Sequence, residues 1–318
     1  MPVSAEDCLV PDKVYQEVSH CILSGYYTDA EKIMDDFITG NPDEPAGPLL
    51  KAAILQYQST DYEDYSREKE FLALIDKVDI LTRKKLEQNG NDLWARYYLA
   101  AADGIKGVWI VSSGKFVRGV YKGRSGAKGM ECIIASDSTF YDAYLLLGSY
   151  LFWKNTAMER ISWLPFIETP EDEGIREVKT AISHGRLTGP LANTVLLEIL
   201  LDHDPEQAMK VGEKMAGEYP LCRLFAWQLG EAYKKLKRYD DAVRIFTGIA
   251  ASMEKDSADD GSGELRCWWK LAVLSKTIGK TGECKYYCNK IVELGKRDSV
   301  YRRQQKRITG AINMLKTR

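Results

Sequence analysis

Residues Leu187–Pro220 read LTGPLANTVLLEILLDHDPEQAMKVGEKMAGEYP, and the next stretch, Leu221–Glu254, reads LCRLFAWQLGEAYKKLKRYDDAVRIFTGIAASME. The two stretches align on each other after 34 residues, so that Ala208 corresponds to Ala242. Each reads as an apolar helix, a short break and a second helix with a small residue on its inner face. Helix pairs with this period bury their apolar faces against neighbouring copies. The repeat therefore predicts an all-α solenoid of stacked antiparallel helix pairs.

The second copy also carries the packing residues that such a pair needs. Its first helix contains Trp227, Leu229, Gly230 and Tyr233, and its second contains Tyr239, Ala242 and Phe246. Small residues suit the places where two helices approach most closely, and large residues fill the gaps beside them. This pattern resembles the tetratricopeptide repeat (TPR) family. The resemblance implies a scaffold whose concave face, lined by the first helix of each pair, holds peptides or partner proteins.

The same scheme continues outward in both directions. Val14–Pro42 and Leu265–Gly295 fit it, and Ser299–Lys316 is predicted to cap the array because an end repeat needs a polar outer face. The chain between the fitting repeats is also predicted to be helical, over Gly47–Thr60, Tyr65–Gln88, Asp92–Ile105, Phe116–Ala135, Tyr141–Trp153 and Gly174–Ser183. We expect six or seven TPR-like pairs and a C-terminal capping helix.

A single domain over residues 1–318 is the simplest organisation of these pairs. Its parts would be divergent N-terminal repeats over 1–135, a repeat with a long insertion over 136–186, regular repeats over 187–295 and the capping helix over 296–318. The insertion, residues 154–173, is rich in apolar residues that would be costly in water, so we expect it to fold against the solenoid. A lid over the groove and a plug in a neighbouring repeat are both open.

The run from Tyr141 to Phe246 has a layout of its own. A helix containing glycine is followed by a long connection with Trp and Pro, then by the helix GIREVKTAISHG and by regular repeats. This layout resembles a divergent branch of the TPR family with bacterial members. It is more distantly similar to the inclusion-body-clearance TPR proteins of eukaryotes.

Composition restricts the function classes and the compartment. The net charge is −2 and the pI about 6.1, which argues against a surface made for nucleic acid. Seven scattered cysteines do not suggest a disulfide framework, and the chain shows no signal peptide and no apolar run long enough to span a bilayer. We therefore expect a cytoplasmic protein. A secreted or periplasmic location is the alternative if Met1 replaces a removed signal peptide.

Helical spacing predicts which side chains face a partner in the groove. These residues are Phe152, Asn193, Trp227, Glu231, Lys234, Trp269 and Lys276. Tryptophan beside lysine could grip a peptide through an aromatic anchor and a cation, or the tryptophans could simply pack between repeats. Some TPR domains bind a chaperone's C-terminal carboxylate through Lys and Asn. This sequence has tryptophan where that clamp needs lysine.

Two basic clusters support an alternative function, an adaptor directed to nucleic acid or to a membrane surface. Residues 104–130 hold six Lys or Arg, no acidic residue and many glycines, and residues 296–318 hold eight basic residues against one Asp. The first cluster has no phosphate-binding loop motif, and for the second a solvated helix face is the simpler expectation. Gly119, Gly123 and Gly126 are better explained by close packing of one helix on its neighbour, with the cations facing water.

We predict no catalytic activity, no cofactor and no metal site. His20, His184 and His203 are far apart in the sequence and none has a metal-ligand spacing. Cys284 and Cys288 lie one helical turn apart, but both occupy positions where this repeat type needs small core residues.

Overall fold

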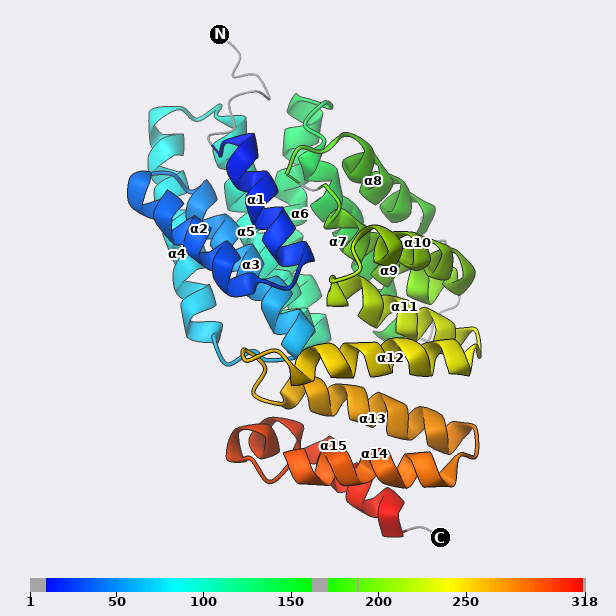
Figure 1. The fold of residues 1–318 in the computed structure, drawn as a ribbon. Coiled ribbons are helices and arrows are strands. Elements are labelled where there is room, and N and C mark those ends of the chain that lie inside the picture. Colours follow the sequence, from blue (N-terminus) through cyan, green and yellow to red (C-terminus); the bar gives the residue numbers. More distant parts are fainter. Residues whose placement is uncertain (1–9, 162–170, 188, 317–318) are drawn as a thin grey trace. The chain divides into compact units, whose positions relative to one another are not determined.

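The computed structural model describes residues 10–161, 171–187 and 189–316, and these residues form fifteen helices and no strand (Figure 1). The helices are α1 (Asp12–Leu23), α2 (Tyr27–Gly40), α3 (Ala46–Tyr62), α4 (Glu68–Gln88), α5 (Leu93–Ser112), α6 (Phe116–Ser136), α7 (Asp142–Ile161), α8 (Glu171–His184), α9 (Ala192–His203), α10 (Pro205–Glu218), α11 (Arg223–Lys235), α12 (Tyr239–Glu254), α13 (Ser262–Thr277), α14 (Thr281–Leu294) and α15 (Asp298–Lys316).

Within the described residues successive helices pack as pairs, α1 with α2, α5 with α6, α7 with α8, α11 with α12 and α13 with α14, and α15 packs on the last of these pairs. This confirms the predicted all-α fold of TPR-like helix pairs. The chain divides into two compact units. Unit 1 consists of Met1–Gln58 and Tyr65–Ile199, and unit 2 of Ser59–Asp64 and Leu200–Arg318. The single domain over 1–318 stays a prediction.

In unit 1, helices α5 and α6 approach closely because glycines face each other across their interface. A Cβ atom on Gly126 would lie 2.5 Å from the backbone oxygen of Ala100, and one on Gly107 would lie 2.9 Å from Cα of Gly123. Real Cβ atoms do not come this close to backbone atoms, so these positions require glycine. The predicted glycine packing of this helix is confirmed.

The predicted boundaries of the insertion at 154–173 are corrected by the helices that flank it. Helix α7 continues to Ile161 and α8 begins at Glu171, so both helices extend into the stretch predicted as a connection. The residues between them, 162–170, lie outside the described residues. The predicted lid or plug falls on these residues and stays a prediction. The two helices meet at Gly148, where a Cβ atom would lie 2.6 Å from the oxygen of Gly174.

In unit 2, the pairs pack as the repeat pattern predicts. Ala208 and Ala242 are fully buried, and a Cβ atom on Gly230 of α11 would lie 2.6 Å from the ring of Phe246 on α12. Residues 255–261 connect α12 to α13, and Gly261 at the end of this connection adopts a left-handed φ of 103° before α13 begins. None of the described helices has both the length and the apolar character needed to cross a bilayer.

Candidate functional site: an arginine cluster that holds an acidic segment

Residues Ser59–Asp64, with the sequence STDYED, belong to unit 2, whereas the residues on both sides of them belong to unit 1. We call these six residues the acidic segment. Helix α3 ends within it at Tyr62, and Glu63 then adopts a left-handed φ of 55°. A residue other than glycine pays about 1–2 kcal/mol for this conformation. Lys237 adopts the same conformation after α11, and in both places a backbone hydrogen bond closes the helix end.

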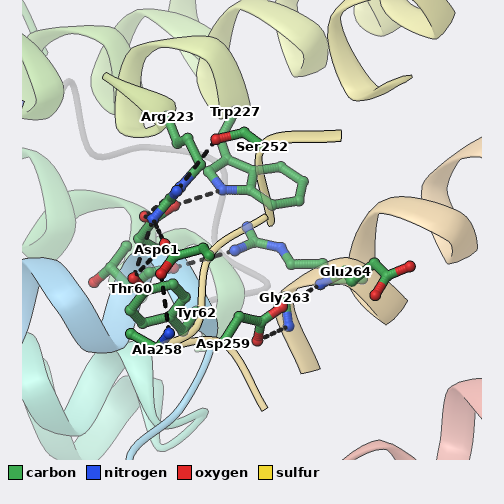
Figure 2. A network of polar contacts seen from close by, with 12 residues as sticks. Thr60, Asp61, Tyr62, Arg223, Trp227, Ser252, Ala258, Asp259, Gly263 and Glu264 are labelled. Atoms are coloured by element: carbon green, nitrogen blue, oxygen red, sulfur yellow. Dashed lines mark hydrogen bonds and ion pairs between the residues drawn. The ribbon is translucent and has the colours of Figure 1, made fainter. Parts of the chain in front are cut away.

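Asp61 is the most deeply buried charge of the segment, with no exposed surface. Its Oδ2 accepts a hydrogen bond of 2.8 Å from Nε of Arg223 and lies 2.7 Å from Nη2 of the same guanidinium, while its Oδ1 accepts one of 3.1 Å from Nε1 of Trp227 (Figure 2). A buried carboxylate is costly unless it is paired and its oxygens accept hydrogen bonds. Both oxygens of Asp61 meet this condition.

Tyr62 extends this network to the connection between α12 and α13. Its hydroxyl donates a 2.7 Å hydrogen bond to Oδ2 of Asp256 and accepts one of 3.2 Å from Arg223. Arg223 also pairs with Asp256 at 2.9 Å. Burial, and then the hydrogen bond to Asp256, raise the pKa of Tyr62 well above its ordinary value. The phenol therefore keeps its proton at neutral pH and acts as a donor.

Glu63 and Asp64 carry the remaining two carboxylates of the segment. Glu63 forms two hydrogen bonds with the guanidinium of Arg307, the one from Nη2 being 3.0 Å long, and lies 3.9 Å from Nε of Arg266. Asp64 pairs with Arg303 at 2.7 Å. Burial would raise the pKa of Glu63, but the hydrogen bonds and charges of Arg307 and Arg266 outweigh it and lower the pKa to about 2.

Helix α13 binds the backbone of the segment as well. Nη1 of Arg266 donates a 3.1 Å hydrogen bond to the carbonyl oxygen of Thr60, and its guanidinium lies 4.0 Å from the ring centroid of Trp227. Asp259 orders the start of this helix, because its two carboxylate oxygens accept hydrogen bonds of 2.9 Å from the backbone N–H groups of Gly263 and Glu264 (Figure 2).

Four arginines thus surround one short stretch of polypeptide, and we call Arg223, Arg266, Arg303 and Arg307 the arginine cluster. They come from α11, α13 and α15, which are the first helices of two successive pairs and the helix that follows them. The cluster is suited to recognising carboxylates and a peptide carbonyl. Among the described residues, no group of three or more His, Cys, Asp or Glu side chains is placed to hold a metal ion.

The predicted partner-binding residues of unit 2 differ in their exposure. Trp227 is only 4% exposed, so it packs inside the protein, and Trp269 is half-buried against Gly310 of α15. Glu231 pairs with both Lys234 and Lys270. Burial opposes ionisation of Glu231, but these two ammonium groups lower its pKa. Lys276 is exposed.

The two predicted partner-binding residues of unit 1, Phe152 and Asn193, contact other parts of the protein. Phe152 is 4% exposed, and Nδ2 of Asn193 donates a 3.2 Å hydrogen bond to the carbonyl oxygen of Pro190. A single partner-binding face made by all seven residues stays a prediction.

The two basic clusters have different surroundings. On α6, Arg118, Lys122, Arg124 and Lys128 are exposed and form no ion pair within the described residues. In the C-terminal cluster, by contrast, Arg303 and Arg307 are engaged by the acidic segment. This second cluster is therefore not the fully solvated surface expected from sequence.

Sequence reasoning did not find the acidic segment or the arginine cluster. Asp61 and Arg223 are separated by 162 residues, and Glu63 and Arg307 by 244 residues. One usable signal was present, because an arginine stands near the start of both α11 and α13, beside the helix positions assigned to the groove.

Comparisons with known proteins find only remote structural similarity. No protein-family model matches the chain, and no curated protein sequence matches it. Among solved structures, the C-terminal part of a TPR repeat-containing protein from Cytophaga hutchinsonii is 12% identical, with a TM-score of 0.45, and the alignment covers 95% of this chain and 100% of that one. The apo form of RapI is 13% identical, with a TM-score of 0.46 and coverages of 95% and 85%.

Proposed function

We propose that this protein is a non-catalytic scaffold that binds a protein or peptide partner through the first helices of the pairs in unit 2. One observation carries the proposal. Helices α11, α13 and α15 already hold a stretch of polypeptide by its side chains and its backbone, as Asp61 and Thr60 illustrate. A face that recognises the chain's own residues has the chemistry to recognise those of a partner.

Exposed side chains on these helices could contribute contacts to a partner. Val273 of α13 is 37% exposed, Lys276 one turn further is exposed, and Lys234 of α11 is partly exposed. An apolar side chain flanked by lysines offers both burial and charge to a partner.

The buried thiols of this unit, among them Cys222 and Cys267, are free, and we place the protein in the reducing cytoplasm.

The test uses a photo-crosslinking amino acid at one of two exposed apolar positions of the same helix pair. Val273 lies on the first helix, α13, and Tyr286, which is 53% exposed, lies on the second helix, α14. In extracts of the source cells, a partner should crosslink at position 273 and not at position 286. Equal yields at both positions, or a partner captured at 286 alone, would contradict the proposed face.

A second candidate function is an adaptor for anionic surfaces, and the exposed cations of α6 favour it. Arg118 and Lys122 flank Tyr121, which is 77% exposed, so that charge and an aromatic ring occupy one face. Binding of this kind weakens steeply with salt. A triple change of Arg118, Lys122 and Arg124 to Gln should abolish binding to single-stranded oligonucleotides or anionic vesicles if this function is real. Wild-type protein that binds neither would exclude it.

A further inference from the structure

We propose that the arginine cluster of unit 2 is a binding site for acidic polypeptide, which the acidic segment occupies in cis and from which an acidic segment of a partner displaces it. This inference rests on the proposed scaffold function and names the chemical class of the partner. It differs from the proposed face around Val273, because the site is filled by the protein itself.

Charge matching is the first argument. Each carboxylate of the segment has its own arginine, with Asp61 on Arg223, Glu63 on Arg307 and Asp64 on Arg303. Within this network, unit 2 contributes carboxylates of its own at Asp256, which pairs with Arg223, and at Asp260, which lies 3.3 Å from Arg303. Four guanidiniums would therefore exceed the carboxylates if the segment left. Partly buried arginines in excess require an anionic occupant.

The second argument identifies the occupant as polypeptide. Arg266 donates to the backbone carbonyl of Thr60, and Trp227 donates its indole N–H to a carboxylate oxygen. The hydroxyl of Tyr62 donates to Asp256. A phosphate group could accept from the arginines, but the carboxylates of Asp256 and Asp260 would repel its double charge. Peptide carbonyls, single carboxylates and a phenol match the site group by group.

The third argument is the backbone of Glu63. This residue holds a left-handed φ of 55° where glycine or asparagine would be unstrained. Its carboxylate simultaneously bonds Arg307 and lies near Arg266. Glu63 follows the end of α3, and the backbone N–H of Asp64 bonds the carbonyl oxygen of Ser59 around it. An occupant with glycine or asparagine at this position would adopt the same conformation without its steric cost.

The acidic segment is part of the same chain as its site, and this determines how strongly an added peptide can compete for the site. The acidic segment is joined at both ends to the rest of the chain, so it faces its site at an effective concentration of about millimolar or above. An added peptide must compete with this concentration and binds the wild-type protein weakly. Removing the charges of the resident segment should therefore expose a stronger site for the same peptide.

The experiment measures binding of a fluorescent synthetic peptide with the sequence of residues 57–66 to the full chain by anisotropy. One protein variant carries Asp61→Asn, Glu63→Gln and Asp64→Asn together. A milder variant carries only Glu63→Gln and Asp64→Asn, whose side chains are about a third exposed, and keeps buried Asp61 for the case in which the triple variant fails to fold. The control peptide carries the same three neutral replacements.

We expect either variant to bind the acidic peptide at least about tenfold more tightly than wild type. The control peptide should not bind, and adding Arg303→Gln and Arg307→Gln to the variant should remove the gain. Equal affinity of variant and wild type, equal binding of the neutral peptide, or equal competition by a single-stranded oligonucleotide would overturn the proposal. If the peptide fails while crosslinking at position 273 succeeds, the scaffold function stands and this inference falls.

Discussion

The α5–α6 pair of unit 1 and the arginine cluster of unit 2 achieve close contact by opposite means. Between α5 and α6, glycines such as Gly107 and Gly126 remove side chains so that two backbones touch. In unit 2, long charged side chains such as Arg223 reach out and pair with the carboxylates of a distant segment. The first solution is dictated by shape and tolerates no added atom, whereas the second is dictated by charge and depends on every partner being present.

The largest effect is expected when the buried charge of unit 2 loses its partner. Asp61→Ala leaves Arg223 with only part of its anionic surroundings and Trp227 without its acceptor. Removing one member of a buried ion pair costs about 3–5 kcal/mol. Urea unfolding followed by circular dichroism should show this loss in the free energy of unfolding. A loss below about 1 kcal/mol would mean that the pair is solvated rather than buried.

The glycine interface should be the next most sensitive. Gly126→Ala places a methyl group 2.5 Å from the backbone oxygen of Ala100, so the helices must separate, at a cost of about 1–3 kcal/mol. The matched control is Gly248→Ala on α12, where a Cβ atom meets nothing within 4 Å. That change should stabilise by about 0.5–1 kcal/mol. If both variants shift the melting temperature in the same direction, helix propensity rather than contact governs the first site.

Lowering the pH should reduce the free energy of unfolding, because Glu63 becomes protonated and loses its charge. Its folded pKa, about 2, lies below the ordinary value of 4.5, so its contribution is complete above about pH 5 and disappears as the pH falls toward 2. Because its side chain is 32% exposed, we expect only about 1–2 kcal/mol. The stability difference between wild type and Glu63→Gln should shrink as the pH falls. A difference that stays constant from pH 7 to about pH 2 would exclude this linkage.

The smallest effect is expected at an exposed ion pair with the same separation as a buried one. Arg83 lies 2.7 Å from Asp79 on α4, as Arg223 does from Asp61, but the Arg83 side chain is 63% exposed and that of Arg223 only 9%. Arg83→Ala should cost less than about 0.5 kcal/mol because solvent screens the pair. Thermal unfolding of wild type and Arg83→Ala in low and high salt measures the contribution of this ion pair. A larger loss that disappears in high salt would contradict the expectation.

The fold and the local packing could be predicted from the sequence, because both depend on residues that are close together along the chain. The 34-residue period predicted the helix pairs, and the small residues Gly230, Ala242 and Gly126 lie at the predicted close contacts. The boundaries of most helices were also within a few residues of those observed, because caps and breaks are local signals. The clearest departures are the end of α5, observed at Ser112 where Ile105 was predicted, and the end of α7, observed at Ile161 where Trp153 was predicted.

The candidate site could not be predicted in the same way. Trp227 has the spacing of a groove residue, yet its indole is buried against Asp61, a residue 166 positions away. Periodicity reports which face of a helix is apolar, but it does not report what covers that face. The pairing of Glu63 with Arg307 likewise depends on a contact between residues 244 positions apart, which forms only after folding.

The most direct test of the central claim is hydrogen exchange of the acidic segment, followed by mass spectrometry on the wild-type protein. The peptide with the sequence of residues 57–66, added above the effective concentration of the tethered segment, should displace that segment. Amides in a fragment containing Ser59–Asp64 should then exchange faster, while amides of α13 around Arg266 stay protected. Unchanged exchange of the segment at saturating peptide would contradict the account.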